Sequence, residues 1–403
     1  MYCYLGKRFK IIAVSSLLFV SAFIFVVVLP VSALEQNFQK TSSTDLIDKA
    51  SQSHAQINVL RSEDPIDMEA IESLYTNDIQ LLVQEVDGNN DLTLDADILQ
   101  AIDDMKNQID TALAAQVVDK TIRRVFFITA LSRTSNVKDN FNQLSTAELN
   151  KLWDEGFAAF DSVDGTVGQT AKVLSEDKLF ILDSSDPGLN DNVIRAFING
   201  QDAINKDSLS QDDGGSDADL TRIKVQRQII RFTMERGFYL IVLKEVKGAL
   251  EKRDNDPDGA KINQKEGEVL HRAIASKVLR DNPDGNVIIE DQLSGPLEGI
   301  VADILIKEYS KAWMAGTVRE LDGNSGAMRD GDIQKAIETG HEGILFASML
   351  IDDLEQRLGK DVRDTVTRTF GNLILSSAKG SVDDALEQRN IIRDILEQYE
   401  ETL

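Results

Sequence analysis

The chain has almost no cysteine. Among its 403 residues the one cysteine is Cys3, and it lies in an N-terminal segment that we expect to be removed. A mature chain that begins after Ala33 therefore has no disulfide and no thiolate chemistry. It must hold its fold by burial of apolar side chains, and a length of about 370 residues is ample for that.

Other absences narrow the function classes. The sequence has no Gly-x-Ser-x-Gly, Walker A or dinucleotide-binding glycine pattern, so it gives no support to the enzyme classes that depend on them. Aromatic residues make up 6% of the chain, which is low for a carbohydrate-binding surface. We predict that the two tryptophans, Trp153 and Trp313, anchor a core or an interface.

Basic residues are few beside the acidic ones. The chain has 43 Lys and Arg against 68 Asp and Glu, which gives a formal net charge of -25. A surface of this kind repels nucleic acid and anionic lipid and attracts cations. We therefore expect no nucleic-acid partner and no lipid binding beyond an N-terminal anchor. The plainer interpretation is that the charge keeps an exported protein soluble.

The N-terminus is typical of a secretory signal. A basic stretch, MYCYLGKRFK, is followed by the apolar run IIAVSSLLFVSAFIFVVVL and by PVSA. This order predicts a signal peptide at 1–33, cut after Ala33. The apolar run is also long enough for an uncleaved membrane anchor. Either way we expect an extracytoplasmic protein, whether periplasmic, secreted or on the cell surface, with a linker at 34–60.

Hydrophobic periodicity predicts an all-α fold. In DADILQAIDDMKNQIDTALAA (95–115) apolar residues recur at three and four positions, and the more apolar stretch 224–252 predicts a central, buried helix. Alternation typical of a strand is almost absent apart from NVIIEDQL. Acidic, glycine-rich stretches such as DNDPDG, DNPDG and DGNSG separate the periodic segments, which predicts packed helical bundles joined by acidic Gly/Asp-rich loops.

Two parts of the chain resemble each other. Residues 87–102 align without gaps on residues 322–337, and eight of these sixteen positions are identical. An apolar, tyrosine-bearing segment precedes each, with Tyr75 in the first and Tyr309 in the second. We predict an internal duplication with one half at 61–210 and the other at 211–403.

The acidic loops raise the question of calcium. In EVDGNNDLTLDADI, Asp87, Asn89 and Asp91 occupy the first, third and fifth positions of an EF-hand-like loop. Leu92 stands where that loop needs glycine, and Ile98 stands where it needs a bidentate glutamate. Loose Ca²⁺ binding and simple capping of the following helices are the two interpretations.

The histidines suggest another metal. Glu268 precedes His271 by three residues and Glu338 precedes His341 by three, and on a helix such pairs share a face. Two Glu-x-x-His pairs, with one glutamate from each of two further helices, form the ligand set of di-iron bundles. Carboxylates with some imidazole suit iron or manganese. The plainer interpretation is two surface contacts, and we predict that His54, which has no acidic neighbour in the sequence, is solvated. The further candidate ligands are Glu155, Glu235, Glu266 and Glu342.

The order of these elements resembles the algal iron-assimilation proteins and their prokaryotic low-iron-inducible periplasmic relatives, a group akin to the phytotransferrins. The likeness lies in the Tyr-bearing helices before each DGN stretch and in KEGEVLHRAIASKV and HEGILFASML. It implies capture of iron, as Fe³⁺ rather than Fe²⁺, outside the cytoplasmic membrane and without catalytic turnover. It adds Tyr75 and Tyr309 as phenolate ligands, and a membrane iron transporter or reductase as the partner.

Two other functions remain open at this point. One is a structural or interaction protein of the cell envelope whose acidic loops bind Ca²⁺ loosely. The other is a di-iron carboxylate enzyme of the oxidase type, which requires both Glu-x-x-His pairs in one bundle. Convergence of the candidate ligands in space distinguishes the metal-binding hypotheses from the structural one.

Overall fold

The computed structural model describes residues 38–176, 188–207 and 217–403, and these residues form helices and no strand. The all-α prediction is confirmed, and NVIIEDQL belongs to a helix. The helices are α2 (Asp45–Leu60), α3 (Met68–Leu74), the π-helix η2 (Tyr75–Ile79), α4 (Gln80–Asn90), α5 (Leu94–Lys106), α6 (Thr111–Asp139), α7 (Thr146–Glu176), α8 (Leu189–Asp207), α9 (Asp217–Lys252), α10 (Pro257–Asp281), α11 (Pro283–Ser294), the 3₁₀ helix η3 (Leu297–Gly299), α12 (Ala302–Asp330), α13 (Ile333–Leu358), α14 (Lys360–Ala378) and α15 (Val382–Glu400).

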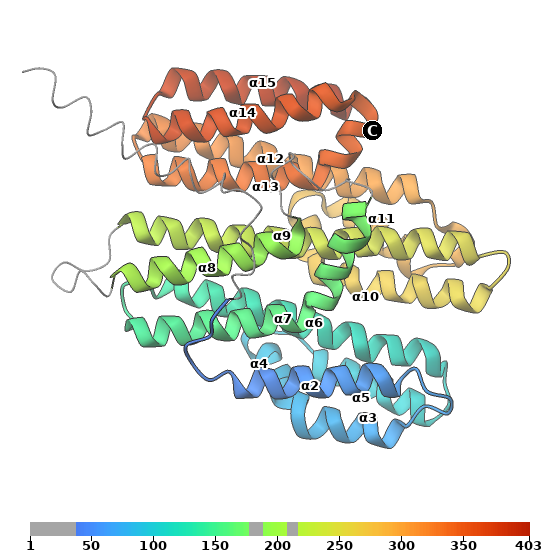
Figure 1. The fold of residues 1–403 in the computed structure, drawn as a ribbon. Helices are drawn as coiled ribbons and strands as arrows, with labels where there is room; N and C mark the ends of the chain where they lie inside the picture. Colours follow the sequence, from blue (N-terminus) through green and yellow to red (C-terminus); the bar gives the residue numbers. More distant parts are fainter. Residues whose placement is uncertain (1–37, 177–187, 208–216) are drawn as a thin grey trace, which may run out of the picture.

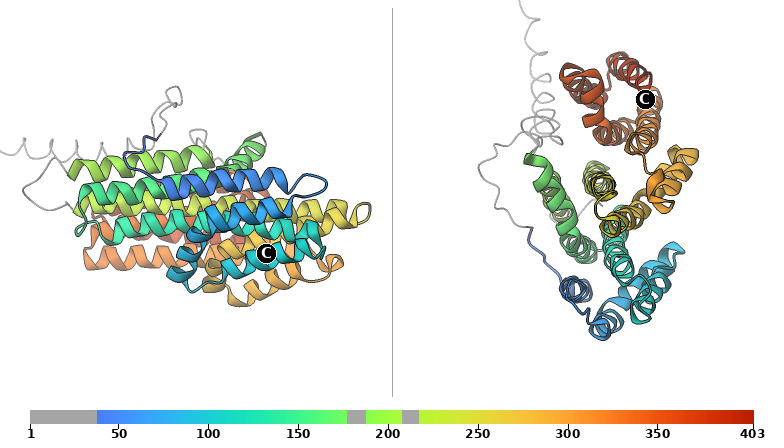
Figure 2. Two further views of the ribbon diagram at one scale, coloured as in Figure 1. Left: turned by 90° about the horizontal axis from the view of Figure 1, so that it is seen from below. Right: turned by 90° about the vertical axis from the view of Figure 1, so that its right-hand side faces the viewer.

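Successive helices pack side by side, and most run along one common direction (Figures 1 and 2). Helices α6 to α9 form one four-helix arrangement, and α12 to α15 form another at the C-terminal end. Helix α10 lies between them and contacts α6, α9 and α12. Short connections between long helices favour this antiparallel stacking.

Helix α9 is the centre of the fold. It packs against α6, α7 and α8 on one side and against α10, α12 and α13 on the other. Buried side chains therefore occur around its whole circumference, as Phe232, Met234 and Phe238 illustrate. The central buried helix predicted at 224–252 is observed. The predicted boundary at 210/211 lies outside the described residues. Helix α9 packs against helices that precede this boundary and against helices that follow it.

Several of the acidic, glycine-rich stretches begin helices. Asp256 and Asn282 are N-caps whose side chains accept hydrogen bonds from the backbone N–H groups of Gly259 and Gly285, and a proline follows each cap as the first helical residue. Asp332 caps α13 by accepting a hydrogen bond from the backbone N–H of Lys335, without a following proline. A side-chain oxygen at the N-cap satisfies a backbone donor that the helix leaves free, and proline has no donor to satisfy.

The calcium-like stretch also serves as a cap. The two carboxylate oxygens of Asp87 each accept a hydrogen bond of 2.9 Å, from the backbone N–H groups of Leu94 and Asp95. The first residue of the EF-hand-like pattern therefore holds the start of α5. This observation favours the capping interpretation, and Ca²⁺ binding stays a prediction.

The second copy of the repeated segment folds differently from the first. In the first copy the chain leaves α4 at Asn90 and begins α5 at Leu94, whereas in the second it stays helical through DGNSG until Asp330. The predicted loop at DGNSG is therefore wrong. Because the two segments turn at different points, the internal duplication stays a prediction from sequence.

The predicted linker at 34–60 needs correction. Residues 45–60 form α2, which buries Ile47, Ala50 and Ile57. The segment before it is tied to α7, since Asp154 accepts hydrogen bonds from the backbone N–H groups of Thr41 and Ser42 at 2.7 and 2.8 Å. The predicted signal segment, 1–33, lies outside the described residues. Among the helices that are described, none has the length and apolarity needed to cross a membrane.

Candidate functional site

The predicted metal ligands do not converge. Across residues 38–176, 188–207 and 217–403, no three His, Cys, Asp or Glu side chains are arranged so that they could hold a metal ion. The ligand set predicted for a shared metal site is therefore not assembled. Its members are Glu155, Glu235, Glu266, Glu268, His271, Tyr309, Glu338, His341 and Glu342.

The first Glu-x-x-His pair separates into two environments on α10. His271 is buried, and its Nδ1 lies 2.7 Å from the hydroxyl of Tyr309 on α12. Glu268 instead pairs with Lys265 and Arg272 on its own helix, and the distance to Arg272 is 2.5 Å. Cations three and four residues away on the same helix compete for the carboxylate. The prediction that Glu268 and His271 share a ligand is wrong.

The second pair also lies in separate contacts, on α13. Glu338 pairs with Lys335 on its own helix and with Lys224 on α9, at 3.4 and 3.5 Å. His341 is partly buried, and desolvation alone lowers its pKa to about 4. The pair is therefore neither a shared ligand site nor the surface contact of the plainer interpretation, since Glu338 is buried and pairs with lysines.

The glycines beside His341 have a packing role. Helix α13 continues without a break through GHEG. A Cβ atom at Gly340 would lie 3.1 Å from Ile374, and one at Gly343 would lie 3.0 Å from a ring carbon of Phe370. Both neighbours are on α14. The two glycines therefore allow α13 and α14 to approach closely, as small residues do at tight helix contacts.

Glu342 lies in a pair of carboxyl groups. It accepts a hydrogen bond from Gln228 on α9 and hydrogen-bonds with Glu320 on α12. Burial raises the pKa of Glu342 first, and the charge of Glu320 raises it further. One proton shared between the two carboxyl groups explains their contact.

A Glu342→Gln variant should be more stable than the wild type near neutral pH. Because the pKa of Glu342 is raised in the folded state, the folded protein keeps a proton that the unfolded chain loses above its ordinary pKa of 4.5. Wild-type stability from this group is therefore full below pH 4.5 and declines as the pH rises through the folded value. Glutamine keeps both hydrogen bonds without a charge, so we expect a gain of about 1 kcal/mol at pH 7. Urea unfolding of both proteins at pH 4 and pH 7 checks this, and a loss of stability at pH 7 would contradict it.

The remaining glutamates face cations. Glu235 is buried on α9, with Arg231 at 3.8 Å and Lys277 at 3.9 Å. Glu266 on α10 lies 3.5 Å from Lys120 on α6, and burial raises its pKa. These ion pairs join neighbouring helices. They explain why acidic residues occur on otherwise apolar segments.

His54 is not solvated, contrary to the sequence prediction. It is buried against α6, where its Nε2 lies 2.8 Å from the fully buried carboxylate of Asp119. Burial lowers the pKa of His54, although the Asp119 carboxylate opposes this. The neutral ring therefore donates its Nε2–H to Asp119. The partner lies 65 positions away in the sequence, so no local pattern could indicate it.

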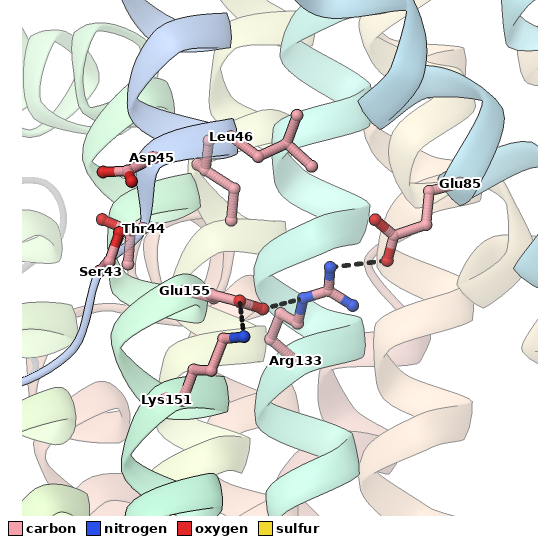
Figure 3. A pocket seen from close by; sticks show the side chains of 9 residues that line it. Ser43, Thr44, Asp45, Leu46, Glu85, Arg133, Lys151 and Glu155 are labelled. Carbon is pink, nitrogen blue, oxygen red and sulfur yellow. Dashed lines mark hydrogen bonds and ion pairs between the residues drawn. The ribbon is translucent and has the colours of Figure 1, made fainter.

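A pocket lies where the start of α2 faces α4, α6 and α7 (Figure 3). Its volume is about 570 Å³, which is within the usual range for small-molecule sites. Charged side chains from four helices line it. The lining residues are Ser43, Thr44, Asp45, Leu46, Ile47, Glu85, Arg133, Lys151 and Glu155.

Arg133 organises one side of this pocket. Its Nη2 lies 2.6 Å from Glu85, and its Nε lies 2.7 Å from Glu155. Figure 3 shows the guanidinium between these carboxylates, with the α2 residues across from it. The side chains of Arg133 and Glu155 are 15% and 17% exposed. The ion pairs therefore fix both groups at the pocket edge while leaving them accessible.

The opposite side of the pocket is the N-terminus of α2. Thr44 occupies the N-cap position of α2, but its hydroxyl accepts no hydrogen bond from the backbone of the helix. The hydroxyl instead donates to Asp48 at 2.7 Å and accepts from Lys40 at 2.9 Å. Ile47 and Asp48 donate their backbone N–H groups to the Thr44 carbonyl, each at 3.0 Å, and the Thr44 side chain caps neither of the two N–H groups before them. A helix N-terminus in this state attracts a negatively charged group. Lys151, whose side chain is 62% exposed and whose Nζ lies 4.0 Å from Glu155, adds a positive charge.

The sequence pointed to one residue of the pocket lining, Glu155, but as a candidate metal ligand. It missed Arg133 and Glu85, because ALSRTSNVK gives no local sign that Arg133 joins two helices. A comparison of the chain with models of known protein families, with curated protein sequences and with solved structures finds no match. The resemblance to iron-assimilation proteins therefore rests on the short motifs alone and stays a hypothesis.

Proposed function

We propose that this protein is a non-catalytic binding protein whose pocket between α2, α4, α6 and α7 takes a small zwitterion of the amino-acid type. The observation that carries the proposal is the lining itself, where three carboxylates and two cations surround a space beside a helix N-terminus. Neither a purely anionic nor a purely cationic ligand complements such a lining. A molecule with one carboxylate and one ammonium group does.

The two ends of the ligand have different partners. The backbone N–H groups of Asp45 and Leu46, which the N-cap side chain does not bond, and the ammonium of Lys151 are suited to the ligand carboxylate. Glu85 and Glu155 are suited to its ammonium group, because each carboxylate has further lone pairs beyond the bond to Arg133. Arg133 orients these two carboxylates, and its positive charge offsets part of their negative charge. Binding without turnover is the simplest activity for this arrangement.

The iron-capture hypothesis makes a different demand. It needs several oxygen ligands around one point, whereas two of the three pocket carboxylates, Glu85 and Glu155, are paired with Arg133. Iron capture and envelope scaffolding stay predictions from the sequence. Both can be tested in the same experiment as the proposal.

Lys151→Gln is expected to weaken zwitterion binding at least about tenfold, the loss of about 1.4 kcal/mol expected when a charge-assisted contact is removed. Isothermal titration of the purified chain with a panel of free amino acids measures this, and the ligand-induced rise in melting temperature gives a second reading. Lys151 is largely exposed, so its replacement should leave the fold intact. Arg133→Gln should weaken binding as well, through the loss of order in Glu85 and Glu155.

Lys138→Gln is the matched control, because Lys138 lies on α6 as Arg133 does but pairs with its neighbour Asp139 outside the pocket. It should bind like the wild type. Fe³⁺, added as a weak chelate, and Ca²⁺ complete the titrations. Stoichiometric iron binding that Lys151→Gln does not change, with no response to any amino acid, would contradict the proposal and favour iron capture.

A further inference from the structure

A buried tyrosine and a buried histidine form a direct pair in the second half of the chain. Tyr309 on α12 is fully buried, and its hydroxyl lies 2.7 Å from Nδ1 of His271 on α10, which is 1% exposed. Their rings meet edge to face with centroids 5.7 Å apart. Four helices, α9 to α12, close around this pair.

The direction of this hydrogen bond follows from burial. Desolvation lowers the pKa of His271 to about 4, so the ring is neutral at physiological pH. Desolvation also raises the pKa of Tyr309 well above its ordinary value, so the phenol keeps its proton. The tyrosine O–H therefore donates to Nδ1, and the imidazole proton resides on Nε2. Nδ1 is a free base held at bonding distance from a phenol that cannot release its proton to water.

The other side of the imidazole leads toward the surface. The side chain of Asn286 on α11 lies beside His271, and its Nδ2 donates to Glu290 at 2.8 Å. Glu290 is exposed. The Asn286 carbonyl and the Glu290 carboxylate place negative potential on the side where a positive charge on His271 would develop. The pair is thus shielded from solvent but lies close to it.

Aromatic rings surround Tyr309 on its other sides. Trp313, one turn further along α12, lies nearly parallel to it with centroids 6.2 Å apart, and Tyr239 from α9 meets its edge at 5.0 Å. Both rings are buried. Rings of this kind are the side chains that can pass on an electron hole. Among them, Tyr309 is the one whose hydroxyl is bonded to a neutral imidazole.

We propose that Tyr309 is a redox-active tyrosine for which His271 is the proton acceptor. An outer-sphere oxidant of the metal-complex class, such as a ruthenium(III) polypyridyl ion in solution, takes one electron from Tyr309 while the phenolic proton moves to Nδ1 of His271. The products are a neutral tyrosyl radical, an imidazolium ion and the reduced oxidant. Return of one electron, for example from a thiol or ascorbate, draws the proton back and restores the pair. The ligand pocket takes no part in this step, so the site is independent of the proposed binding function.

The coupling of proton and electron follows from the surroundings. Electron loss alone would leave a cationic phenol in an apolar site, and proton loss alone would leave a phenolate there, and both are costly. Transfer of the proton along an existing 2.7 Å hydrogen bond avoids both species. Oxidation at Tyr309 should therefore be easier than at a buried tyrosine without a basic partner.

Flash oxidation of the full chain with photogenerated tris-bipyridyl ruthenium(III) tests this, with electron paramagnetic resonance to detect the radical. We expect a neutral tyrosyl signal that is lost in Tyr309→Phe and retained in the control Tyr239→Phe, whose ring lies in the same cluster. His271→Gln should slow radical formation at least about tenfold. The wild type should show slower formation in D₂O, which a role in packing alone would not produce.

Two results would overturn the proposal. One is a tyrosyl signal of full amplitude in a folded Tyr309→Phe variant, since the radical would then reside elsewhere. The other is a wild-type rate that does not change in D₂O or in His271→Gln. Because the D₂O measurement needs no variant, the proposal remains testable even if Tyr309→Phe fails to fold. Circular dichroism of each variant shows whether the helices are retained.

Discussion

Replacement of Asp119 by asparagine is expected to lower the free energy of unfolding by about 3–5 kcal/mol, the usual cost of removing one partner from a buried ion pair. Asp119 is fully buried on α6. One of its oxygens meets His54 at 2.8 Å and Arg123 at 3.0 Å, and the other meets Arg61 and Lys120, each at 3.0 Å. Asparagine has the same shape but no charge, so three partly buried cations would lose their common counterion.

The effect of Asp119 should depend on pH in a defined direction. Burial alone would raise the pKa of Asp119, but the hydrogen bond to His54 and the charges of Arg123 and Lys120 hold it well below the ordinary 3.8. Its contribution to stability is therefore full above pH 3.8 and is lost as the pH falls through the lower, folded value. The difference in unfolding free energy between wild type and Asp119→Asn should be largest at neutral pH and shrink below pH 3.8.

Guanidinium-induced unfolding across this pH range measures both effects. Asp139→Asn is the matched control, because Asp139 lies on the same helix but its side chain is 58% exposed. We expect it to change stability by no more than about 0.5 kcal/mol. A similarly small change for Asp119→Asn would mean that the cations find solvent or other acceptors, and that Asp119 does not hold α2 to α6.

The helices could be predicted because their information is local. Apolar residues at three- and four-residue spacing set the buried face of each helix, and the stretch 224–252, with apolar residues on several faces, is buried around its circumference. The helix N-caps can also be predicted from the sequence, since Asp256 and Asn282 each precede a proline. The unbroken helix through DGNSG could not be predicted, because packing against neighbouring helices outweighs the weak helix propensity of glycine.

The side-chain partners could not be predicted, because tertiary packing chooses them. The i,i+3 spacing correctly placed Glu268 and His271 near each other along α10. Glu268, however, pairs with cations on its own helix, whereas His271 hydrogen-bonds with Tyr309, 38 positions away. Asp119 and Arg133 join residues from separate helices in the same manner. Two of the proposed ligands, His271 and Tyr309, are in contact, and this contact satisfies a buried tyrosine without assembling a metal site.

Trp153→Ala is expected to destabilise the protein by about 3–5 kcal/mol, as large-to-small changes of buried aromatic residues do. The ring of Trp153 on α7 is fully buried, and its Nε1–H donates to the carbonyl of Phe197 on α8 at 2.8 Å. The Phe197 ring meets it edge-on at 5.4 Å. Alanine would leave a cavity between α7 and α8 and a buried carbonyl without its donor, so both losses add.

The same contact can be tested from the opposite helix. A Cβ atom at Gly200 on α8 would lie 2.1 Å from Cζ2 of Trp153, so Gly200→Ala forces the ring to move and should cost about 1–3 kcal/mol. Gly371→Ala is the control: this residue is also helical, a Cβ there would meet nothing within 4 Å, and the change should be neutral or stabilising by up to about 1 kcal/mol. In thermal unfolding, the costs of Trp153→Ala and Gly200→Ala should add to more than the cost of the double variant, because alanine at 200 fits the space that the ring leaves. Additive costs would show that the glycine and the ring do not share that space, which would contradict the packing of α7 against α8 described above.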